Sequence, residues 1–222
     1  MKLRTVGLAL AAVMSAHASL IVLTPSSVIG GSSTYGGTYN TGSFRASYIL
    51  DTQAGPITES SGSPSDFWLN EENGSADAYI TIDLGATYSL ASVDLFNSHN
   101  AGYNDRGTGS FTIRAGNSVT AGPAGTGMTL TGGGALILTD TLTASSSGSE
   151  PIGAQSFSLA GSYRYLEFHA AGIASSGPSC CSATAYALNE MRIFDSPAPE
   201  PGSITLLLTG FAALLLRRRL AR

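Results

Sequence analysis

The segment Asn97–Arg106 concentrates hydrogen-bonding and aromatic side chains in one short stretch of the chain. It carries amides, an imidazole, a phenol, a carboxylate and a guanidinium, on Asn97, His99, Asn100, Tyr103, Asp105 and Arg106. Sugars are bound by such mixtures, because their hydroxyls need donors and acceptors while their C–H faces pack on aromatic rings. The segment is therefore a candidate carbohydrate-binding loop.

Structural roles compete with binding for several of these residues. Asp105 and Arg106 are interpreted first as an ion pair that holds the loop, with Asn and Gly residues as turn formers. For His99 and Tyr103 both roles stay open. Trp68, the only tryptophan, would stack on a sugar if exposed and would anchor the core if buried, and burial is the preferred interpretation.

Catalytic patterns are missing from the sequence. After removal of the leader described below, only His99 and His169 remain, and neither a Gly-x-Ser-x-Gly nor a His-Glu-x-x-His pattern occurs. We therefore predict a protein that is not an enzyme. A hydrolase whose site is not recognisable in the sequence, acting through Glu167 or Glu190, is a third and weaker hypothesis.

Charge is distributed unevenly along the chain. Between the two ends lie five arginines, no lysine and fourteen of the fifteen acidic residues, a net charge of about −9. Binding to nucleic acid needs clustered cations, so no nucleic-acid partner is expected. An acidic surface suits either solubility or the binding of divalent cations.

The N-terminus has the features of a secretory signal peptide. Lys2 and Arg4 precede the apolar run Val6–Met14, and Ala16-His17-Ala18 forms an A-x-A cleavage site. The apolar run is too short to span a bilayer. We expect residues 1–18 to be removed by cleavage after Ala18 and the protein to be exported.

The C-terminus, residues 196–222, has the features of a membrane-directed tail. A proline-rich linker precedes the uncharged run Ile204–Leu216, and an arginine cluster follows it. As a short transmembrane helix this run would leave the arginines on the cytoplasmic side. An ordinary tail anchor is one interpretation of this segment.

The same tail resembles the PEP-CTERM sorting signal in its order of parts: a tripeptide, a spacer, an apolar run and a basic end. The residues that carry the resemblance are Pro199, Glu200, Pro201, Arg217, Arg218 and Arg219. The resemblance implies an exosortase-type transpeptidase as partner, transient anchoring in the inner membrane through the C-terminal helix, and a place in the cell envelope, at the cell surface or in an extracellular, biofilm-forming matrix.

The region between the ends shows the period-two alternation of β-strands and no sustained helical period. Gly85–Thr87 is expected to be a turn, and Gly116–Gly134 and Ser145–Gly153 are expected to be surface loops. Short strands with Gly-rich turns predict an all-β sandwich or barrel. The expected strands are Phe44–Leu50, Tyr79–Leu84, Leu90–Asn97, Ser110–Ala115, Leu136–Leu142, Gln155–Leu159, Tyr163–Ala170 and Leu188–Phe194.

This region resembles the discoidin or coagulation factor 5/8 C-terminal family. The resemblance is carried by Phe67-Trp68, Ala78–Gly85, Tyr88–Val93, Asn104–Thr108 and Leu188–Phe194. It implies a jelly-roll β-sandwich of the galactose-binding-domain type over 43–195, after an N-terminal segment, 19–42. In that family, loops at one end bind glycans, or sometimes lipids or proteins, and the tryptophan tends to be structural.

The resemblance also implies a structural Ca²⁺. The candidate ligands are Asp51, Asp66 and Glu190, although Ser61 stands where the family usually has an aspartate. The first functional hypothesis is thus a non-catalytic module that binds extracellular polysaccharide or a cell-surface glycan. The alternative is a structural matrix or adhesion protein with no site for a small glycan.

Overall fold

The structure is a computed structural model of the whole chain, and it describes residues 18–59, 66–71, 78–177 and 185–196. The chain divides into two compact units, and the fold described below is that of the unit Ser19–Ser196. The predicted signal peptide up to residue 17, the sorting tail from residue 197 with its expected helix, and Ser61 lie outside the described residues. Among the described residues, no helix is long and apolar enough to cross a membrane.

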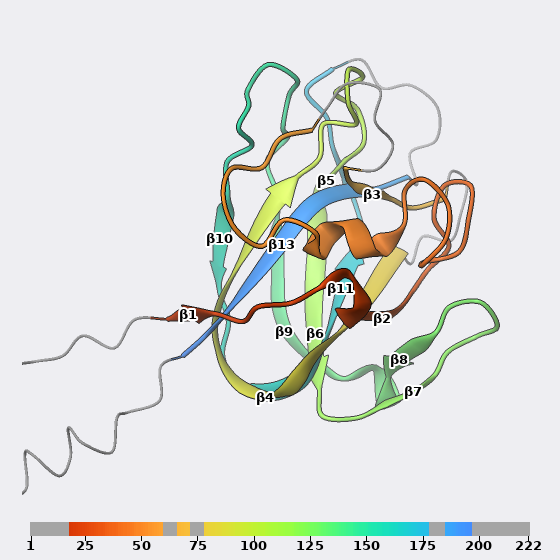
Figure 1. Cartoon of the computed structure of the whole chain (residues 1–222), viewed down its shortest axis with the longest axis vertical. Helices are drawn as coiled ribbons and strands as arrows, with labels where there is room; N and C mark the ends of the chain where they lie inside the picture. Colours follow the sequence, from red (N-terminus) through yellow and green to blue (C-terminus); the bar gives the residue numbers. More distant parts are fainter. Residues whose placement is uncertain (1–17, 60–65, 72–77, 178–184, 197–222) are drawn as a thin grey trace, which may run out of the picture. The chain divides into compact units, whose positions relative to one another are not determined.

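One long strand, β4 (Ala78–Asn97), contributes to both layers of the domain (Figure 1). Ile80, Ile82 and Leu84 are buried along its first half, as their alternation predicted. The turn predicted at Gly85–Thr87 is wrong, because these residues are exposed but the strand continues through them. Gly85 has a φ of 83°, which glycine adopts at no steric cost, so the strand bends here without ending.

The two halves of β4 lie in different sheets. Its first half belongs to a sheet with the strand order β2-β4-β11-β6-β9. Its second half pairs with β10 and β13 in the other sheet. In that sheet β13 also pairs with β1, β3 and β5, and β5 pairs with β12. The other strands are β1 (Ser19–Leu20), β2 (Val28–Gly31), β3 (Trp68–Leu69), β5 (Gly107–Thr108), β6 (Ser110–Gly116), β9 (Ala135–Thr141), β10 (Gln155–Ser158), β11 (Ser162–Ala170), β12 (Ile173–Ala174) and β13 (Ala187–Asp195).

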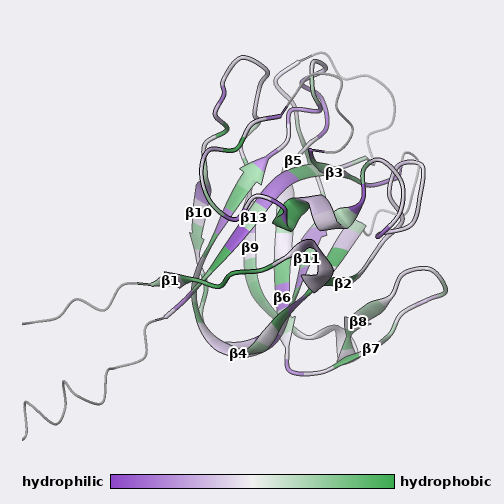
Figure 2. Cartoon of the chain, in the orientation of Figure 1, coloured by the Kyte–Doolittle hydropathy of each residue, from purple (hydrophilic) through white to green (hydrophobic). Residues whose placement is uncertain are grey.

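The hydrophobic core is built from alternate side chains of these strands. Phe168 of β11 stacks on Phe111 of β6, with ring centroids 5.6 Å apart, and meets Trp68 of β3 edge to face at 6.3 Å. All three are fully buried, and burying a side chain of this size contributes roughly 1.5–3 kcal/mol. Figure 2 shows the corresponding hydrophobic bands along the strands. The predicted all-β fold is thus confirmed, and its aromatic contacts join the two sheets.

Most predicted strands are confirmed, with the ends of β6, β9, β10, β11 and β13 within one residue of expectation. The strand predicted at Phe44–Leu50 is wrong: Ala46–Leu50 forms a 3-10 helix, η2. Ala46, Ile49 and Leu50 are its buried residues, and this spacing places them on one helical face. Phe44, Ala46, Tyr48 and Leu50 fit a period-two alternation as well, so the pattern in so short a segment is ambiguous.

The predicted surface loop Gly116–Gly134 is also more ordered than expected. It contains a hairpin formed by β7 (Val119–Ala121) and β8 (Met128–Leu130), followed by the 3-10 turn η3 (Thr131–Gly133). The N-terminal segment, 19–42, is part of the same compact unit. It supplies β1, the 3-10 turn η1 (Pro25–Ser27) and β2, and its Ile21 and Leu23 enter the core.

Candidate functional site

Three loops meet at the end of the domain where β4 stops, at the top of Figure 1. They are 98–106, 142–154 and 171–177, and together they are called the rim below. Asn104 joins all three. Its side-chain Nδ2 donates to Ser147 Oγ at 3.1 Å, and its backbone oxygen accepts from the N–H groups of Ser176 at 3.0 Å and Gly177 at 2.9 Å. One residue therefore fixes the relative positions of the rim loops.

The loop 98–106 is held in an unusual backbone conformation. Asn100, Ala101 and Asn104 have φ values of 54°, 54° and 56°, in the left-handed region that costs energy for residues with a side chain. The surrounding bonds fix the turn, since the N–H of Asn104 donates to His99 O at 2.7 Å. Tyr103 lies within this rigid turn and is 66% exposed. A large aromatic ring is therefore presented to solvent on a fixed support.

A buried network, absent from the sequence analysis, supports this loop from below. The N–H groups of His99 and Ala101 donate to the Glu59 carboxylate, which also accepts from Asn189 Nδ2 at 3.2 Å. His99 Nε2 lies 3.2 Å from Glu150 Oε1, and the same oxygen accepts from the N–H of Glu59 at 2.9 Å. His99 is only 1% exposed. Of the two roles left open for His99, the structure supports the structural one, because its buried ring joins two loops.

Asn97 is hydrogen-bonded within the fold, and it is also one of the residues that line the pocket described below. Its Nδ2 donates to the backbone oxygens of Thr108 and Thr143, both at 2.8 Å, and its Oδ1 accepts from the N–H of Thr108 at 2.9 Å. The side chain is fully buried. Three hydrogen bonds use most of the amide's capacity and attach the end of β4 to the neighbouring chain segments.

Asp105 and Arg106 lie together as the ion pair that the preferred interpretation expected, and both are buried. Arg106 Nε lies 3.7 Å from Asp105 Oδ2, and Asn100 Nδ2 donates to Asp105 Oδ1 at 2.6 Å. Asn100 is partly buried through this bond, so its amide is also engaged. The pair holds the loop. Trp68 is fully buried against Phe168, so its stacking role is excluded by burial.

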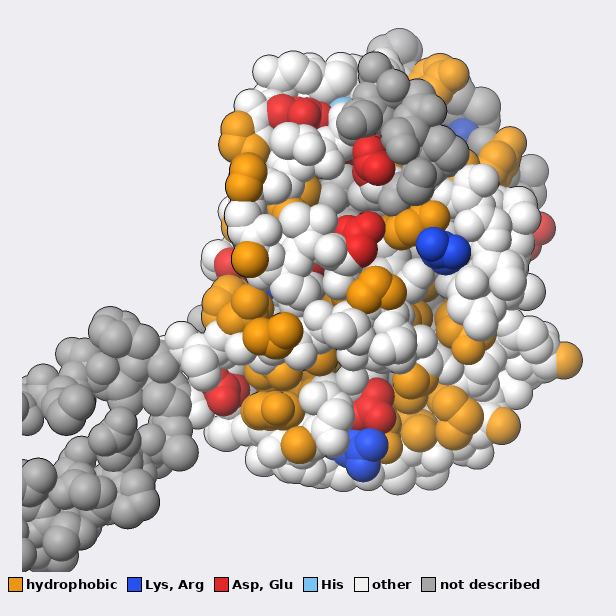
Figure 3. All heavy atoms as spheres, viewed as in Figure 1, with side chains coloured by type: hydrophobic (Ala, Val, Ile, Leu, Met, Phe, Trp, Pro, Cys, Tyr) orange, Lys and Arg blue, Asp and Glu red, His pale blue; other side chains and the backbone are white. Residues whose placement is uncertain are grey.

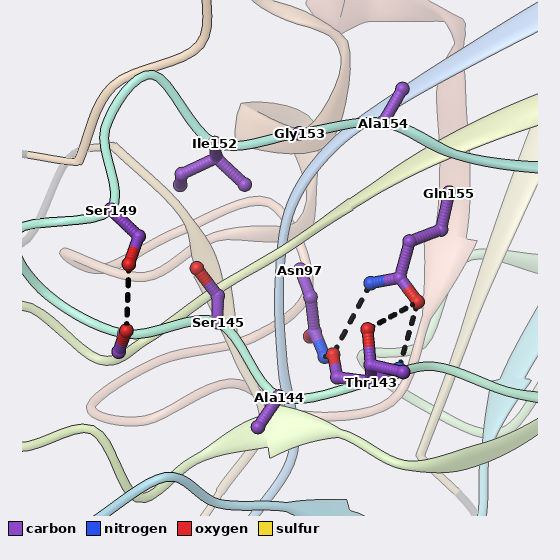
Figure 4. Close-up of a pocket in the computed structure, with 10 residues that line it drawn as sticks. Asn97, Thr143, Ala144, Ser145, Ser149, Ile152, Gly153, Ala154 and Gln155 are labelled. Atoms are coloured by element: carbon purple, nitrogen blue, oxygen red, sulfur yellow. Dashed lines mark hydrogen bonds between the residues drawn. The ribbon is translucent and has the colours of Figure 1, made fainter.

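A polar pocket of about 270 Å³ opens beside the rim (Figure 4). Hydroxyl and amide groups line most of it, and Ile152 gives it an apolar wall. Gln155 Oε1 accepts from the Thr143 N–H at 2.8 Å and from Thr143 Oγ1 at 2.9 Å. The residues lining it are Asn97, Thr143, Ala144, Ser145, Ser146, Ser149, Ile152, Gly153, Ala154 and Gln155.

Hydrogen bonds join the loop that lines the pocket to the turn that carries Tyr103. Ser147, between two pocket residues, bonds to Asn104, and the Ser176 hydroxyl donates to Ser145 O at 2.8 Å. Sequence analysis missed this pocket because it predicts Ser145–Gly153 only as a surface loop. Its density of hydroxyl side chains was the available signal. Of the residues first proposed to bind sugar, Tyr103 alone is both exposed and on the rim.

The proposed calcium ligands do come near one another. Burial raises the pKa of Glu190 to about 8, and the charge of Asp51 adds to the shift. Burial also raises the pKa of Asp51, with a further contribution from Asp66. Burial is the main cause of both shifts and the neighbouring carboxylates add to it, so a cation bound here would favour the ionised forms. In the described ranges, however, no group of three or more His, Cys, Asp or Glu side chains is arranged to hold a metal ion.

The carboxylates considered for hydrolysis are both engaged in the fold. Glu190 accepts from the Thr52 N–H at 3.1 Å and from Gln53 Nε2 at 2.5 Å. Glu167 accepts from Thr81 Oγ1 at 3.0 Å and lies 2.7 Å from His169 Nε2. Both side chains are buried. The observed bonding of both groups is that of structural carboxylates.

Solved structures with a similar fold are known. The CBM32-3 module of a family 31 glycoside hydrolase from Clostridium perfringens matches with a TM-score of 0.50 and 13% identity, over 78% of this chain and 94% of that one. The family 32 module of NanJ from C. perfringens, in complex with galactose, has a TM-score of 0.49 and 13% identity, over 81% and 100%. A fucolectin from striped bass (Morone saxatilis) serum has a TM-score of 0.47 and 16% identity, over 77% and 45%.

At the sequence level, no protein-family model and no curated protein matches the chain. The likeness to the first of the modules shows the fold and, at 13% identity, the fold alone. The unit Ser19–Ser196 is therefore a galactose-binding-like β-sandwich, as the discoidin resemblance implied for its body.

Proposed function

We propose that the unit Ser19–Ser196 is a non-catalytic module that binds extracellular polysaccharide through its rim. One observation carries the proposal: Tyr103 is 66% exposed on a turn that is hydrogen-bonded, through Asn104, to the loop forming a pocket lined by hydroxyl and amide groups. An aromatic ring packs on the C–H face of a sugar, and nearby polar groups bond to its hydroxyls. Because the turn is already ordered, little conformational entropy is lost on binding.

The fold supports the same function. The module that matches with a TM-score of 0.50 is a carbohydrate-binding module from a glycoside hydrolase. In the present protein, the corresponding part of the molecule would act without a catalytic site. Its proposed setting is an exported chain whose tail is recognised by an exosortase-type transpeptidase at the inner membrane, which would deliver the module to the envelope, surface or matrix.

A Ca²⁺ bound near Asp51 and Glu190 is part of this proposal. It would offset the repulsion between the two carboxylates and hold the segment at Thr52 against β13. Its proposed role is to stabilise the fold. Thermal unfolding of Ser19–Ser196 measured with Ca²⁺ and with EDTA tests this, because a bound ion raises the Tm and a domain that binds no ion is unaffected.

A glycan array followed by calorimetry on Ser19–Ser196 tests the main proposal. Replacing Tyr103 by alanine is expected to weaken binding at least about tenfold, about 1.4 kcal/mol, through loss of the stacked ring. Tyr35→Ala is the matched control, because Tyr35 is a 46% exposed tyrosine outside the rim. If no glycan binds with or without Ca²⁺, the glycan-binding function is rejected and a structural matrix or adhesion role becomes the better account.

A further inference from the structure

Ser19 and Asp195 form a contact at the point where both ends of the chain leave the domain. The two residues are directly opposite in the antiparallel pairing of β1 with β13. The backbone N–H of Ser19 donates to Asp195 Oδ1 at 3.1 Å, and the Ser19 hydroxyl donates to the same oxygen. The nitrogen in this contact belongs to the Ala18–Ser19 peptide bond, which is the bond expected to be cut on export.

We propose that cleavage after Ala18 converts this contact into an ion pair that locks β1 to β13. A peptidase of the export machinery adds water across the Ala18–Ser19 bond. The C–N bond breaks, a carboxylate forms on Ala18 and an ammonium group forms on Ser19. The nitrogen atom stays beside Asp195 and gains a full positive charge, and charge-assisted hydrogen bonds are roughly twice as strong as neutral ones.

The surrounding residues hold Ser19 in place for this change. The N–H of Ile21 donates to Ile193 O at 2.8 Å, and Ile21 and Leu23 are buried in the core. Ser19 itself is exposed, so the preceding peptide bond lies at the surface of the unit. The new charge would therefore appear at a position that the fold has already fixed, with little entropy left to lose.

The proposed ion pair lies where the C-terminal tail leaves the domain. Asp195 is the last residue of β13, and the next residue, Ser196, donates its N–H to Ser89 O. The linker to the C-terminal tail starts immediately afterwards. Removal of the leader would thus tighten the last strand at the residue from which the tail departs, so that export processing and the stability of the tail's attachment point are coupled.

The composition of the domain allows an unusually clean test. Residues 19–196 contain no lysine, so the Ser19 α-amino group is the only primary amine in that chain. Acetylation therefore removes this one charge and nothing else. The Ser19–Ser196 unit is compact and contains its own hydrophobic core, so it is the part of the chain to test. We expect acetylation to lower the Tm by about 2 °C and to speed exchange of the Ile21 amide about threefold.

Asp195→Asn is the control, because it keeps an acceptor oxygen but removes the negative charge. In this variant, acetylation is expected to change neither the Tm nor the amide exchange. An equal effect of acetylation in both proteins, or no effect in the parent, would overturn the ion pair. N-terminal sequencing of the exported full chain completes the test, because a mature end other than Ser19 would also reject the proposal.

Discussion

At the residue scale, burial separates the side chains that are available for binding from those that are not, as Asn97 and Tyr103 illustrate. Both belong to the segment singled out by its composition, yet Asn97 is fully buried in backbone hydrogen bonds and Tyr103 is exposed. Composition shows what a side chain can bond to. Composition does not show whether the protein itself already supplies those partners. For most of this segment, the protein does supply them.

Glu59 is a residue that sequence analysis overlooked although its carboxylate supports the rim. It supports the rim through bonds to His99, Ala101 and Asn189, but it lies far from all three in the sequence. Nothing in the residues around Glu59 indicated this role. Long-range polar networks depend on the packed geometry, and a single sequence contains no direct signal for them.

Replacement of Glu59 by glutamine is expected to destabilise the domain by about 2–3 kcal/mol. The change removes a buried charge-assisted acceptor and places an NH₂ group opposite backbone donors. Urea unfolding measures the loss. Glu71→Gln is a suitable control, since Glu71 makes an exposed bond to Ser33 and should change stability by less than about 0.5 kcal/mol. Equal effects of the two substitutions would contradict the assigned role of Glu59.

At the element scale, period-two alternation located the strands, whereas connections between them were less predictable. β6 and β11 were placed within one residue, because each has one face in the core. The bend of β4 at Gly85 was not predictable, because Gly85-Ala86-Thr87 after an alternating run is compatible both with a turn and with a strand that bends and continues. The pairing of strands also depends on contacts between distant segments, which no local pattern reports.

Glu167 of β11 attaches strand β8 of the β7–β8 hairpin to the sheet, in addition to the backbone bridge between Gly30 and Gly127. This carboxylate accepts from Thr129 Oγ1 at 2.8 Å and from the Leu130 N–H at 3.1 Å, both on β8. Burial alone would raise the pKa of Glu167, but hydrogen bonds from His169, Thr129 and Leu130 outweigh it, and the net shift is downward. A lowered carboxyl pKa in the folded state stabilises the protein at pH values where the group is ionised.

Acid should therefore weaken the hairpin. The contribution of Glu167 is fully present above its ordinary pKa of 4.5 and is lost as the pH falls through the lower value of the folded state. Amide exchange of Leu130 is expected to increase in that acid range, relative to its exchange at pH 6. Glu167→Gln should remove this pH dependence. If the variant keeps the same acid response, another group is responsible for it.

At the scale of the whole molecule, the charge distribution restricts the kind of polysaccharide that can bind. Each of the five arginines of this region has a partner within the domain: Tyr48, Asp105, Gly133, Asp83 and Thr52 for Arg45, Arg106, Arg114, Arg164 and Arg192, respectively. Glu150, by contrast, is 30% exposed on the rim. Figure 3 shows Asp and Glu side chains distributed across one face of the domain.

Glycans without carboxylate or sulfate groups are accordingly expected to bind better than polyuronates. An anionic polymer would meet like charge at the rim, so its affinity should be at least about tenfold lower than that of a neutral polymer and should rise with salt. Calorimetry with neutral galactan and with alginate at two salt concentrations measures the difference. Tight, salt-weakened binding of alginate would contradict this prediction while leaving the binding function itself intact.

The fold class followed from the pattern of the whole chain, but the location of the pocket did not. Alternation, sparse charge and Gly-rich turns indicated a β-sandwich, and the global architecture agrees. The pocket arises where 142–154 folds against the end of β4, and its position depends on bonds such as that from Asn97 to Thr143 O. Such loop geometry is set by the completed fold, after the strands are in place.

The direction of β13 determines how the domain would bear a mechanical load. The end of β13 at Asp195 leads to the tail, and its start at Ala187 pairs with β3 and β5. Along its length β13 pairs with β4, which ends at the rim. A polymer held at the rim and pulled against the tail would draw β13 along its own axis. The backbone bonds to its neighbours would then be sheared together instead of opening one at a time, which is the arrangement that resists force best.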